Sequence, residues 1–302
     1  MHCREAAGFE LTPLAVLHCR RAAARRYDLA AMHRQYVHLN SRTLSYFDSA
    51  PGESQADVLV LIHAFPLGAG MWEGQAKGLP AGWRLLAPDL RGFGGSTLGE
   101  PDDNPSMDDY AADVVDLLRE LHITSAAIGG CSMGGYAALA AVRRARELVR
   151  ALVIIDSRVG ADTSEGRANR RGMLALLDRE GPSGVARDMM PKLLGKTTLS
   201  ERPDVEPFVR RLVKQQSAAA VRGGILRMMT RPASADVLEN LTVPLLIVVG
   251  EEDTLTPPEE ARAMAALQPN AELVVIPRAG HLPNLEAPET FNQALHAFLS
   301  RL

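Results

Sequence analysis

The sequence is poor in cysteine: among its 302 residues there are three, Cys3, Cys19 and Cys131. The number is odd and no two of them form a CxxC pair, so neither a disulfide framework nor a structural zinc site is indicated. Cysteine usage without disulfides fits a reducing compartment, and we therefore expect a cytoplasmic protein.

Long apolar runs and an excess of one charge are also lacking. No apolar run reaches the ~18 residues that a membrane-spanning helix needs, so we expect no membrane span. The formal net charge is −3, which provides no basic field for nucleic acid. The hydrophobic share of 46% and the charged share of 23% are those of an ordinary globular protein, and the length suits one large domain or one domain with an inserted lobe. The sequence leaves the oligomeric state open between monomer and dimer.

Residues 1–31 are set apart from the rest. A short apolar stretch, Leu11–Leu17, comes before a cluster of arginines at 20–26, whereas a secretory signal has its charges before the apolar segment. We interpret residues 1–31 as an extension outside the fold; an arginine-rich amphipathic leader is the alternative.

Apolar runs and helical patterns alternate along most of the remaining chain. Strands are predicted as a hairpin over Tyr36–Asn40 and Thr43–Phe47 and then at Asp57–His63, Arg84–Pro88, Ser125–Gly129, Ala151–Asp156, Val243–Gly250 and Glu272–Pro277. Helices are predicted at Met107–His122, Met133–Arg146, Pro257–Leu267 and Pro288–Leu302. This alternation predicts the α/β class, with a mostly parallel sheet flanked by helices.

The alternation stops between residue 157 and about residue 236, where helical patterns and arginines occur without a comparable strand. We interpret residues 158–236 as a helical cap domain inserted into a core formed by residues 32–157 and 237–302.

The pentapeptide Gly130-Cys131-Ser132-Met133-Gly134 matches G-x-S-x-G. It follows a predicted strand and opens a predicted helix, which is the strand–turn–helix setting of a nucleophile elbow. Small residues at 130 and 134 allow strand and helix to approach closely, so that the serine hydroxyl stands above the sheet at a helix N-terminus. Ser132 is therefore the candidate nucleophile.

A serine hydroxyl needs a base that takes its proton, and His281 is the best-placed histidine. It follows the strand ending at Pro277 and precedes the last helix. His122 and His296 lie at the end of and within helices, and His63 precedes the nucleophile in a loop better suited to stabilising an oxyanion.

The base in turn needs an acid that holds its tautomer. The segment Gly250-Glu251-Glu252-Asp253 directly follows the strand that starts at Val243, and Asp253 is our candidate. Glu251 and Glu252 compete with it but are expected to face solvent, and Asp156, at the end of another strand, is a rival whose simpler interpretation is a strand-end cap.

The oxyanion hole needs two N–H donors. Met133 N–H at the start of the helix is one. The second should come from the loop after the Asp57–His63 strand, where Pro66 has no N–H and Phe65 is the candidate.

Together these segments resemble the α/β-hydrolases, in particular small bacterial carboxylesterases and 3-oxoadipate enol-lactonases. The resemblance runs from about residue 35 to the C-terminus and rests on GCSMGGY, HAFPLGAGMW, APDLRGFGGS, GEEDTLTPP and AGHLPNLEAPE. It implies an α/β-hydrolase fold, an ester hydrolase without cofactor or metal, a catalytic triad of Ser132, Asp253 and His281, and an oxyanion hole of Phe65 and Met133. One departure is Ala64, which stands where relatives usually have glycine.

The expected function is a serine carboxylesterase, of the EC 3.1.1.1 type, that hydrolyses small-to-medium acyl esters with water through an acyl-enzyme. Five methionines of the cap are candidates for lining an acyl pocket, with plain core packing as the alternative: Met173, Met189, Met190, Met228 and Met229. Arg158 is a candidate contact for a substrate carboxylate, which would favour a lactonase. The alternatives are enol-lactone or C–C bond hydrolysis with the same triad, and a non-enzymatic small-ligand receptor on the same fold.

Overall fold

A computed structural model describes residues 33–39, 41–99 and 104–302. The predicted extension over residues 1–31, with Cys3 and Cys19, lies outside the described residues. Among the described helices, none combines the length and the apolar character that crossing a membrane requires.

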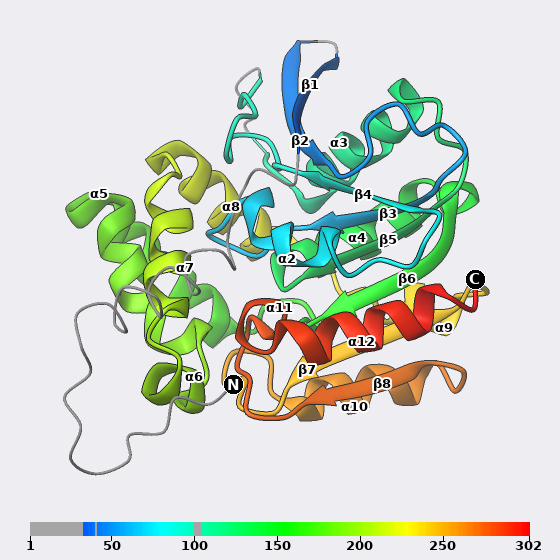
Figure 1. Ribbon diagram of the computed structural model, residues 1–302. Coiled ribbons are helices and arrows are strands. Elements are labelled where there is room, and N and C mark those ends of the chain that lie inside the picture. Colours follow the sequence, from blue (N-terminus) through cyan, green and yellow to red (C-terminus); the bar gives the residue numbers. More distant parts are fainter. Residues whose placement is uncertain (1–32, 40, 100–103) are drawn as a thin grey trace, which may run out of the picture.

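The described residues form one eight-stranded sheet with the strand order β1-β2-β4-β3-β5-β6-β7-β8 (Figure 1). The strands are β1 (His33–Leu39), β2 (Arg42–Asp48), β3 (Asp57–Ile62), β4 (Trp83–Pro88), β5 (Ala126–Cys131), β6 (Val149–Ile155), β7 (Leu245–Gly250) and β8 (Glu272–Ile276). The first two strands form the predicted hairpin and β2 pairs antiparallel with β4, whereas every other pairing is parallel. The predicted α/β class and mostly parallel sheet are therefore confirmed.

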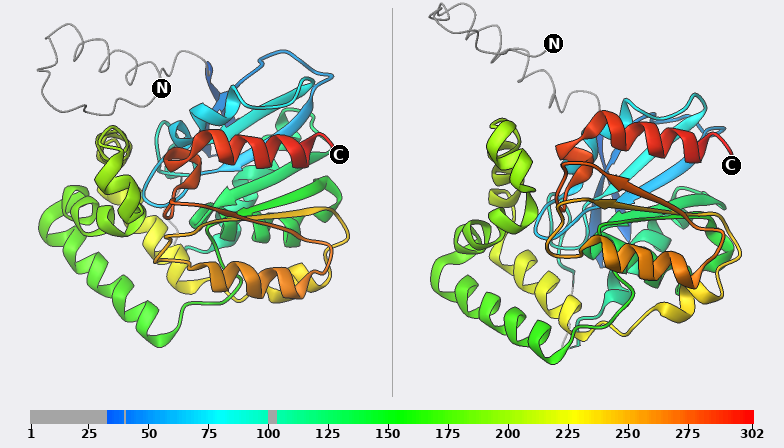
Figure 2. Two further views of the ribbon diagram at one scale, coloured as in Figure 1. Left: turned by 60° about the horizontal axis from the view of Figure 1, so that its bottom comes forward. Right: turned by 90° about the horizontal axis from the view of Figure 1, so that it is seen from below.

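Helices cover both faces of the sheet. They are α2 (Glu73–Ala76), α3 (Met107–Glu120), α4 (Met133–Arg144), α5 (Ser164–Leu193), α6 (Lys196–Glu201), α7 (Val205–Lys214), α8 (Ala218–Thr230), α9 (Ala235–Glu239), α10 (Pro258–Leu267), α11 (Pro283–Glu286) and α12 (Pro288–Leu299), with the short 3-10 turns η3 (Ala69–Trp72) and η4 (Arg146–Leu148). α3 packs against α4, and α9 touches both α4 and α10. α12 packs with α2 and α11, and Figure 2 shows α12 and α10 on opposite faces.

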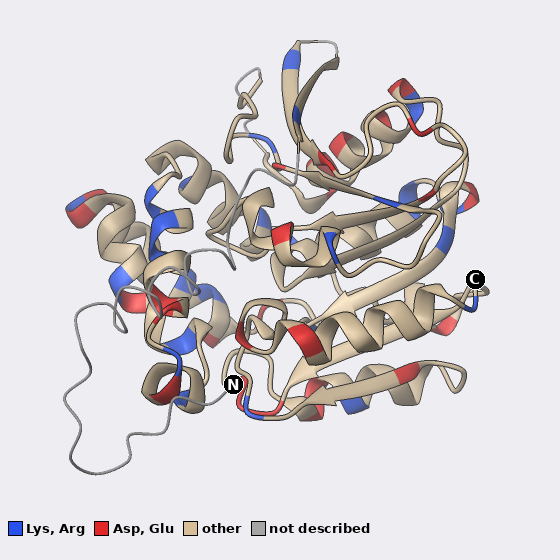
Figure 3. Ribbon diagram, viewed as in Figure 1, with Lys and Arg blue, Asp and Glu red and all other residues tan. Residues whose placement is uncertain are grey.

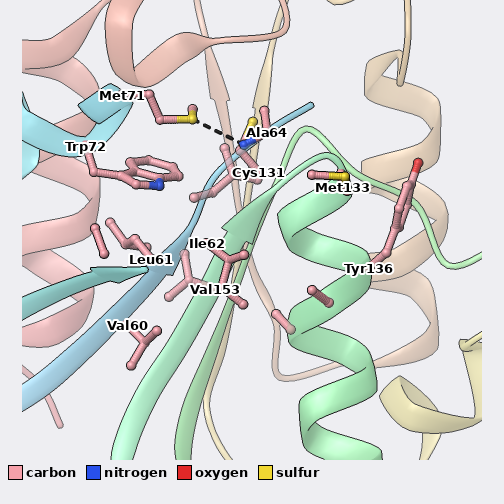
Figure 4. Close-up of a cluster of buried hydrophobic side chains, with 14 of the residues drawn as sticks. Val60, Leu61, Ile62, Ala64, Met71, Trp72, Cys131, Met133, Tyr136 and Val153 are labelled. Atoms are coloured by element: carbon pink, nitrogen blue, oxygen red, sulfur yellow. Dashed lines mark hydrogen bonds between the residues drawn. The ribbon is translucent and has the colours of Figure 1, made fainter. Parts of the chain in front are cut away.

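The core lies between these layers because the central strands are apolar on both faces. All the residues of β5 and β7 are buried, as parallel strands covered on both sides require. In Figure 4 Leu61 and Trp72 lie on the other side of the strands from Met133 and Tyr136 of α4. Packing on both faces thus fixes the carboxyl ends of these strands, and with them the starting points of the loops that follow.

Between β6 and β7 the described chain forms helices only. α5 to α8 lie together beside the carboxyl ends of the strands (Figures 1 and 2). α5 is interrupted at Gly181, whose φ of 65° is not helical, so it consists of two arms. The helical character expected of this segment is present, whereas its division from the core at residues 158 and 236 stays a prediction.

Candidate active site

The turn between β5 and α4 holds Ser132 in a strained conformation. Its φ is 53°, a region that side chains other than glycine rarely adopt. The peptide is fixed on both sides: Ser132 N–H donates to Ile155 O at 2.9 Å, and Ser157 Oγ donates to Ser132 O at 3.0 Å. Ser132 is half-buried and lines the main pocket, so this turn exposes one hydroxyl at the end of a buried strand.

The glycines of the motif are required by close backbone contacts. A Cβ on Gly130 would lie 2.2 Å from the carbonyl carbon of Gly134, and one on Gly134 would lie 2.2 Å from Ile62 O. No side chain fits at such distances. The start of α4 therefore rests directly on the end of β3, next to the loop that carries Phe65.

The two candidate oxyanion donors occupy the expected elements. Met133 is the first residue of α4, and Phe65 lies in the loop after β3. Among the residues that the structure describes, neither amide N–H has a protein acceptor. Ala64, the departure from the related sequences, is buried, and its N–H points to Met71 Sδ at 3.2 Å (Figure 4).

His281 and Asp253 meet although they are far apart in the sequence. His281 follows β8, Asp253 follows β7, and His281 Nδ1 lies 2.8 Å from Asp253 Oδ2. Both side chains are buried, with 1% and 3% of the residue surface exposed. His281 lines the same pocket as Ser132. The loops thus place an imidazole, oriented by a carboxylate, in the cavity that contains the serine.

The Asp253 carboxylate accepts hydrogen bonds at both oxygens. Oδ1 accepts from Leu255 N–H at 2.8 Å and Thr256 N–H at 3.2 Å, and Oδ2 also accepts from Thr256 Oγ at 2.5 Å. Burial by itself raises the pKa of a carboxyl, but the facing His281 and these donors outweigh it and lower the pKa of Asp253 to about 2. Asp253 is consequently ionised at neutral pH. Thr256 was not singled out from the sequence, although its spacing of three residues from the acid is typical of a side-chain turn.

Asp156, the rival acid, is buried and caps the end of the neighbouring strand β7. It follows β6 with a φ of 41°, is 1% exposed, and its Oδ1 accepts from Gly250 N–H at 2.8 Å. Burial, and then the nearby Asp253 carboxylate, raise the pKa of Asp156 well above its ordinary value of 3.8. Two neighbouring carboxyl groups therefore lie close to His281, one with a lowered pKa (Asp253) and one with a raised pKa (Asp156).

Within the described residues, Asp156, Asp253 and His281 also form a group whose side chains could bind a metal ion. One ligand atom from each lies within 4.8 Å of the others. A cation there would compete with the 2.8 Å contact between the imidazole and Asp253 and with the N–H donors on Asp253. The hydrogen-bonded arrangement suits proton transfer at the other ring nitrogen.

Glu252 and Glu286 connect the catalytic loops to the helical segment, which the sequence did not indicate. Glu252 was expected to face solvent, but it accepts from Thr197 N–H at 2.9 Å and from Thr197 Oγ at 2.6 Å. Glu286 is buried and accepts from Gly195 N–H at 2.7 Å and Leu282 N–H at 3.0 Å. Because Leu282 follows the histidine directly, Glu286 fixes the His281 loop against the chain before α6.

His63 lies below the oxyanion loop and takes no part in the Asp253–His281 pair. Its Nε2 accepts from Leu90 N–H at 3.1 Å, and its Nδ1 lies 3.0 Å from Ala64 O. Burial lowers the pKa of His63, which favours the neutral ring. It fastens the loop after β3 to the loop after β4.

The pocket above Ser132 has a volume of about 720 Å³. Its buried lining is mostly apolar and its exposed lining is mostly polar. The apolar lining residues include Phe65, Tyr136, Met173, Leu176, Met189, Met228 and Leu255. The polar ones nearer solvent include Glu165, Asn169, Asp188 and Lys192. Of the five expected methionines, Met173, Met189 and Met228 line the cavity, whereas Met190 and Met229 are not among its lining residues and pack against the core.

Comparison with known proteins finds proteins of similar sequence and fold. A family model described as alpha/beta hydrolase fold matches residues 57–288. The solved structure of a thermophilic esterase from Thermogutta terrifontis, with malate bound, is 35% identical, has a TM-score of 0.82, and is matched over 89% of this chain and 98% of that chain.

Two more distant proteins extend the comparison. A pimeloyl-[acyl-carrier protein] methyl ester esterase from Neisseria meningitidis is 25% identical over 76% of this chain and 89% of that protein. The enol-lactonase from Burkholderia xenovorans LB400 is 22% identical with a TM-score of 0.80, over 88% of this chain and 100% of that chain, and shares the fold.

Proposed function

Because the chain belongs to the alpha/beta hydrolase fold family, we propose that it is a serine carboxylesterase that hydrolyses small-to-medium acyl esters through an acyl-enzyme. The observation that carries the proposal is the pairing of His281 Nδ1 with Asp253 Oδ2 at 2.8 Å in the pocket that Ser132 lines. The esterases of Thermogutta terrifontis and Neisseria meningitidis support the same reaction class.

The tautomer of His281 explains how Ser132 becomes a nucleophile. An ionised Asp253 is an acceptor only, so it selects the ring form with the proton on Nδ1. The lone pair then lies on Nε2, which takes the Ser132 proton as Oγ attacks the ester carbonyl carbon. The imidazolium that forms is stabilised by the carboxylate behind it.

The attack moves negative charge onto the former carbonyl oxygen. The N–H groups of Met133 and Phe65 are not used by protein acceptors in the described chain and serve as its donors. Each donor of this kind contributes on the order of 10²–10³ in rate. The close contact between the start of α4 and the end of β3 holds these two N–H donors in place before the substrate binds.

Collapse of the tetrahedral intermediate breaks the bond to the alkoxide, which takes the proton from Nε2 of His281 and leaves as an alcohol. Water then repeats the sequence on the acyl-Ser132 ester: Nε2 accepts a water proton, hydroxide adds to the carbonyl carbon, and Ser132 Oγ leaves with that proton. The products are an alcohol and a carboxylic acid, and the enzyme returns to its starting state.

The size of the pocket supports small-to-medium acyl groups. Its volume of about 720 Å³ falls within the ~300–1,000 Å³ range of small-molecule sites. The apolar floor binds the acyl chain, and methionines such as Met189 adapt to its shape.

Enol-lactone hydrolysis by the same triad is the second candidate, and Arg158 favours it. This side chain lines the pocket, donates to Leu255 O, and has Nη1 3.4 Å from Glu260. A substrate carboxylate at the pocket mouth would find a guanidinium there.

A panel of aryl esters of rising acyl length, run beside several lactones, tests the proposal. Ser132→Ala should reduce kcat by on the order of 10⁵-fold or more, because the nucleophile is removed. Ser183→Ala, at an exposed position of α5, is the matched control and should keep wild-type turnover. Near-wild-type turnover in Ser132→Ala, or no steady turnover of any ester, would contradict the proposal, and the latter result would favour a receptor.

A further inference from the structure

A second buried carboxyl lies beneath the catalytic pair, and the mechanism above does not use it. Asp156 directly follows β6 and is held by two hydrogen bonds: its N–H donates to Val248 O at 2.9 Å, and its Oδ1 accepts from Gly250 N–H at 2.8 Å. Its φ of 41° turns the chain off the strand. The fold therefore places this side chain as firmly as it places Asp253.

The other oxygen of Asp156 has no acceptor role within the described chain. Oδ2 is buried and accepts no hydrogen bond there, whereas a hydrogen bond to the Asp253 carboxyl is among the causes that raise the pKa of Asp156. The nearby polar side chains are those of Asp253 and His281, each with a polar atom within 4.8 Å of a carboxyl oxygen of Asp156. An ionised carboxylate oxygen left without a donor in a buried site is costly.

The charges around Asp156 are of one sign except for the imidazole. Asp253 on the loop after β7 and Glu286 on α11 are acidic, Cys131 at the end of β5 is a buried thiol, and His281 follows β8. Two ionised carboxyl groups at this separation in a buried site repel strongly. Asp253 has four hydrogen bonds to its ionised form and keeps the negative charge, so Asp156 keeps the proton.

We infer that Asp156 is a reserve acid: a neutral carboxyl that ionises and supports His281 when Asp253 loses its charge. This inference rests on the proposed function. Removing the Asp253 charge removes the repulsion that keeps Asp156 protonated, and Oδ2 then becomes an acceptor for the imidazole. Oδ1 keeps its bond to Gly250 N–H throughout, so the backbone need not move. Asp156 is in this sense a positioning residue that is silent in the intact enzyme.

Three variants test the inference, read by the rate at which a fluorophosphonate labels Ser132 and by kcat/KM on an aryl ester. Asp156→Asn is isosteric with the neutral carboxyl and should stay within about 3-fold of wild type. Asp253→Ala should lose about 10²-fold, and Asp253→Ala combined with Asp156→Asn about 10⁴-fold, the loss typical of a triad left without its acid. Thermal unfolding of each variant checks folding, and Asp253→Asn with and without Asp156→Asn replaces the alanine pair if that pair does not fold.

The pH profile separates a reserve acid from a structural role. In Asp253→Ala the acid limb of kcat/KM should lie at higher pH than in the double variant, because a carboxylate still favours a proton on the imidazole. Equal rates and equal profiles for Asp253→Ala and the double variant would overturn the inference. So would a loss of about 10⁴-fold in Asp156→Asn alone, which would make Asp156 the working acid. A wild-type chain that is labelled at Ser132 but hydrolyses no ester would contradict the proposed function alone.

Discussion

The two sides of the pocket differ in how deeply their side chains are buried. On the sheet side, strand-end loops hold His281 and Asp253 with almost no exposure. On the other side, the first arm of α5, before Gly181, has Leu177 as its only buried residue. All the other buried residues of α5 lie in its second arm. Figure 3 shows the same contrast, with few charges along the central strands and many on α5 to α8.

Under the proposed function, the sheet side carries out the reaction and the helical side selects the substrate. A triad needs fixed distances, which a closely packed sheet edge provides. A substrate pocket needs shape, which half-buried side chains on a helix arm can change at little cost to folding. Substitutions on the sheet side should therefore abolish turnover or folding, and substitutions on the helical side should change which ester is preferred.

The largest effect should come from the proposed base. His281→Ala should lower kcat by on the order of 10⁵-fold, because His281 is the group proposed to take the Ser132 proton. His296→Ala, on the exposed face of α12, is the control and should leave kcat unchanged. Steady-state kinetics on an aryl ester gives both values, and equal activities for the two variants would remove His281 from the mechanism.

A pair of glycine substitutions compares the packing of the two regions directly. Gly134→Ala places a Cβ 2.2 Å from Ile62 O and should destabilise by about 3 kcal/mol or more. Gly172→Ala, in the first arm of α5, meets nothing within 4 Å and should stabilise by ~0.5–1 kcal/mol, as alanine favours helix. Denaturant unfolding measures both. A stable Gly134→Ala protein would show that α4 and β3 are not in the close contact described.

The two buried acids should affect stability with opposite dependence on pH. The pKa of Asp253 is about 2 in the folded protein against an ordinary 3.8, so it contributes about 2 kcal/mol above pH 4, which is lost as pH falls through 2. The pKa of Asp156 is raised by burial and by Asp253, so its cost to folding is absent below pH 3.8 and grows as pH rises.

Unfolding free energies from pH 2 to 8 test both signs. Asp253→Asn should lack the part of the acid-dependent loss, about 2 kcal/mol between pH 4 and 2, that Asp253 contributes in wild type. Asp156→Asn should match wild type near pH 3 and become the more stable protein toward pH 8. An Asp156→Asn curve parallel to that of wild type would mean that Asp156 ionises normally.

The smallest effect is expected on the helical side. Met173→Ala should leave folding unchanged, because this half-buried side chain lines the pocket, and should shift the preferred acyl chain toward greater length by about 3- to 10-fold in relative kcat/KM. Arg171→Ala, exposed and outside the pocket lining, is the control. An unchanged chain-length profile in Met173→Ala would place acyl selection elsewhere.

Much of the frame follows from local sequence. The runs around Val60 and Ile247 are apolar on both faces and fit only buried parallel strands, and the predicted bounds of β3 and β7 differ from the observed ones by one or two residues. The helices after Met133 and Pro257 begin next to the residues that their glycine and proline signals indicate. The turn at Ser132 was predictable because glycines on both sides of the serine are typical of a tight strand–turn–helix junction, where a Cβ would meet the backbone.

Other features depend on contacts between distant segments. Glu252 looked like a solvent-facing neighbour of the acid, yet it binds Thr197 of the helical segment. Nothing in the local pattern around Glu286 indicates that it joins Gly195 to the histidine loop. Such partners lie many residues away, and periodicity carries no information about them.

The sequence by itself determined the strand–helix rhythm, the strained turn at Ser132 and the chain order of Ser132, Asp253 and His281, because glycine, apolar runs and strand ends act through neighbouring residues. Only the tertiary structure decided that Asp253 is the hydrogen-bonded, ionised acid and that Asp156 is its neutral neighbour. The physical reason is that the ionisation of a buried carboxyl depends on which donors and charges the fold places around it, and here both carboxyl groups follow strands and look alike along the chain.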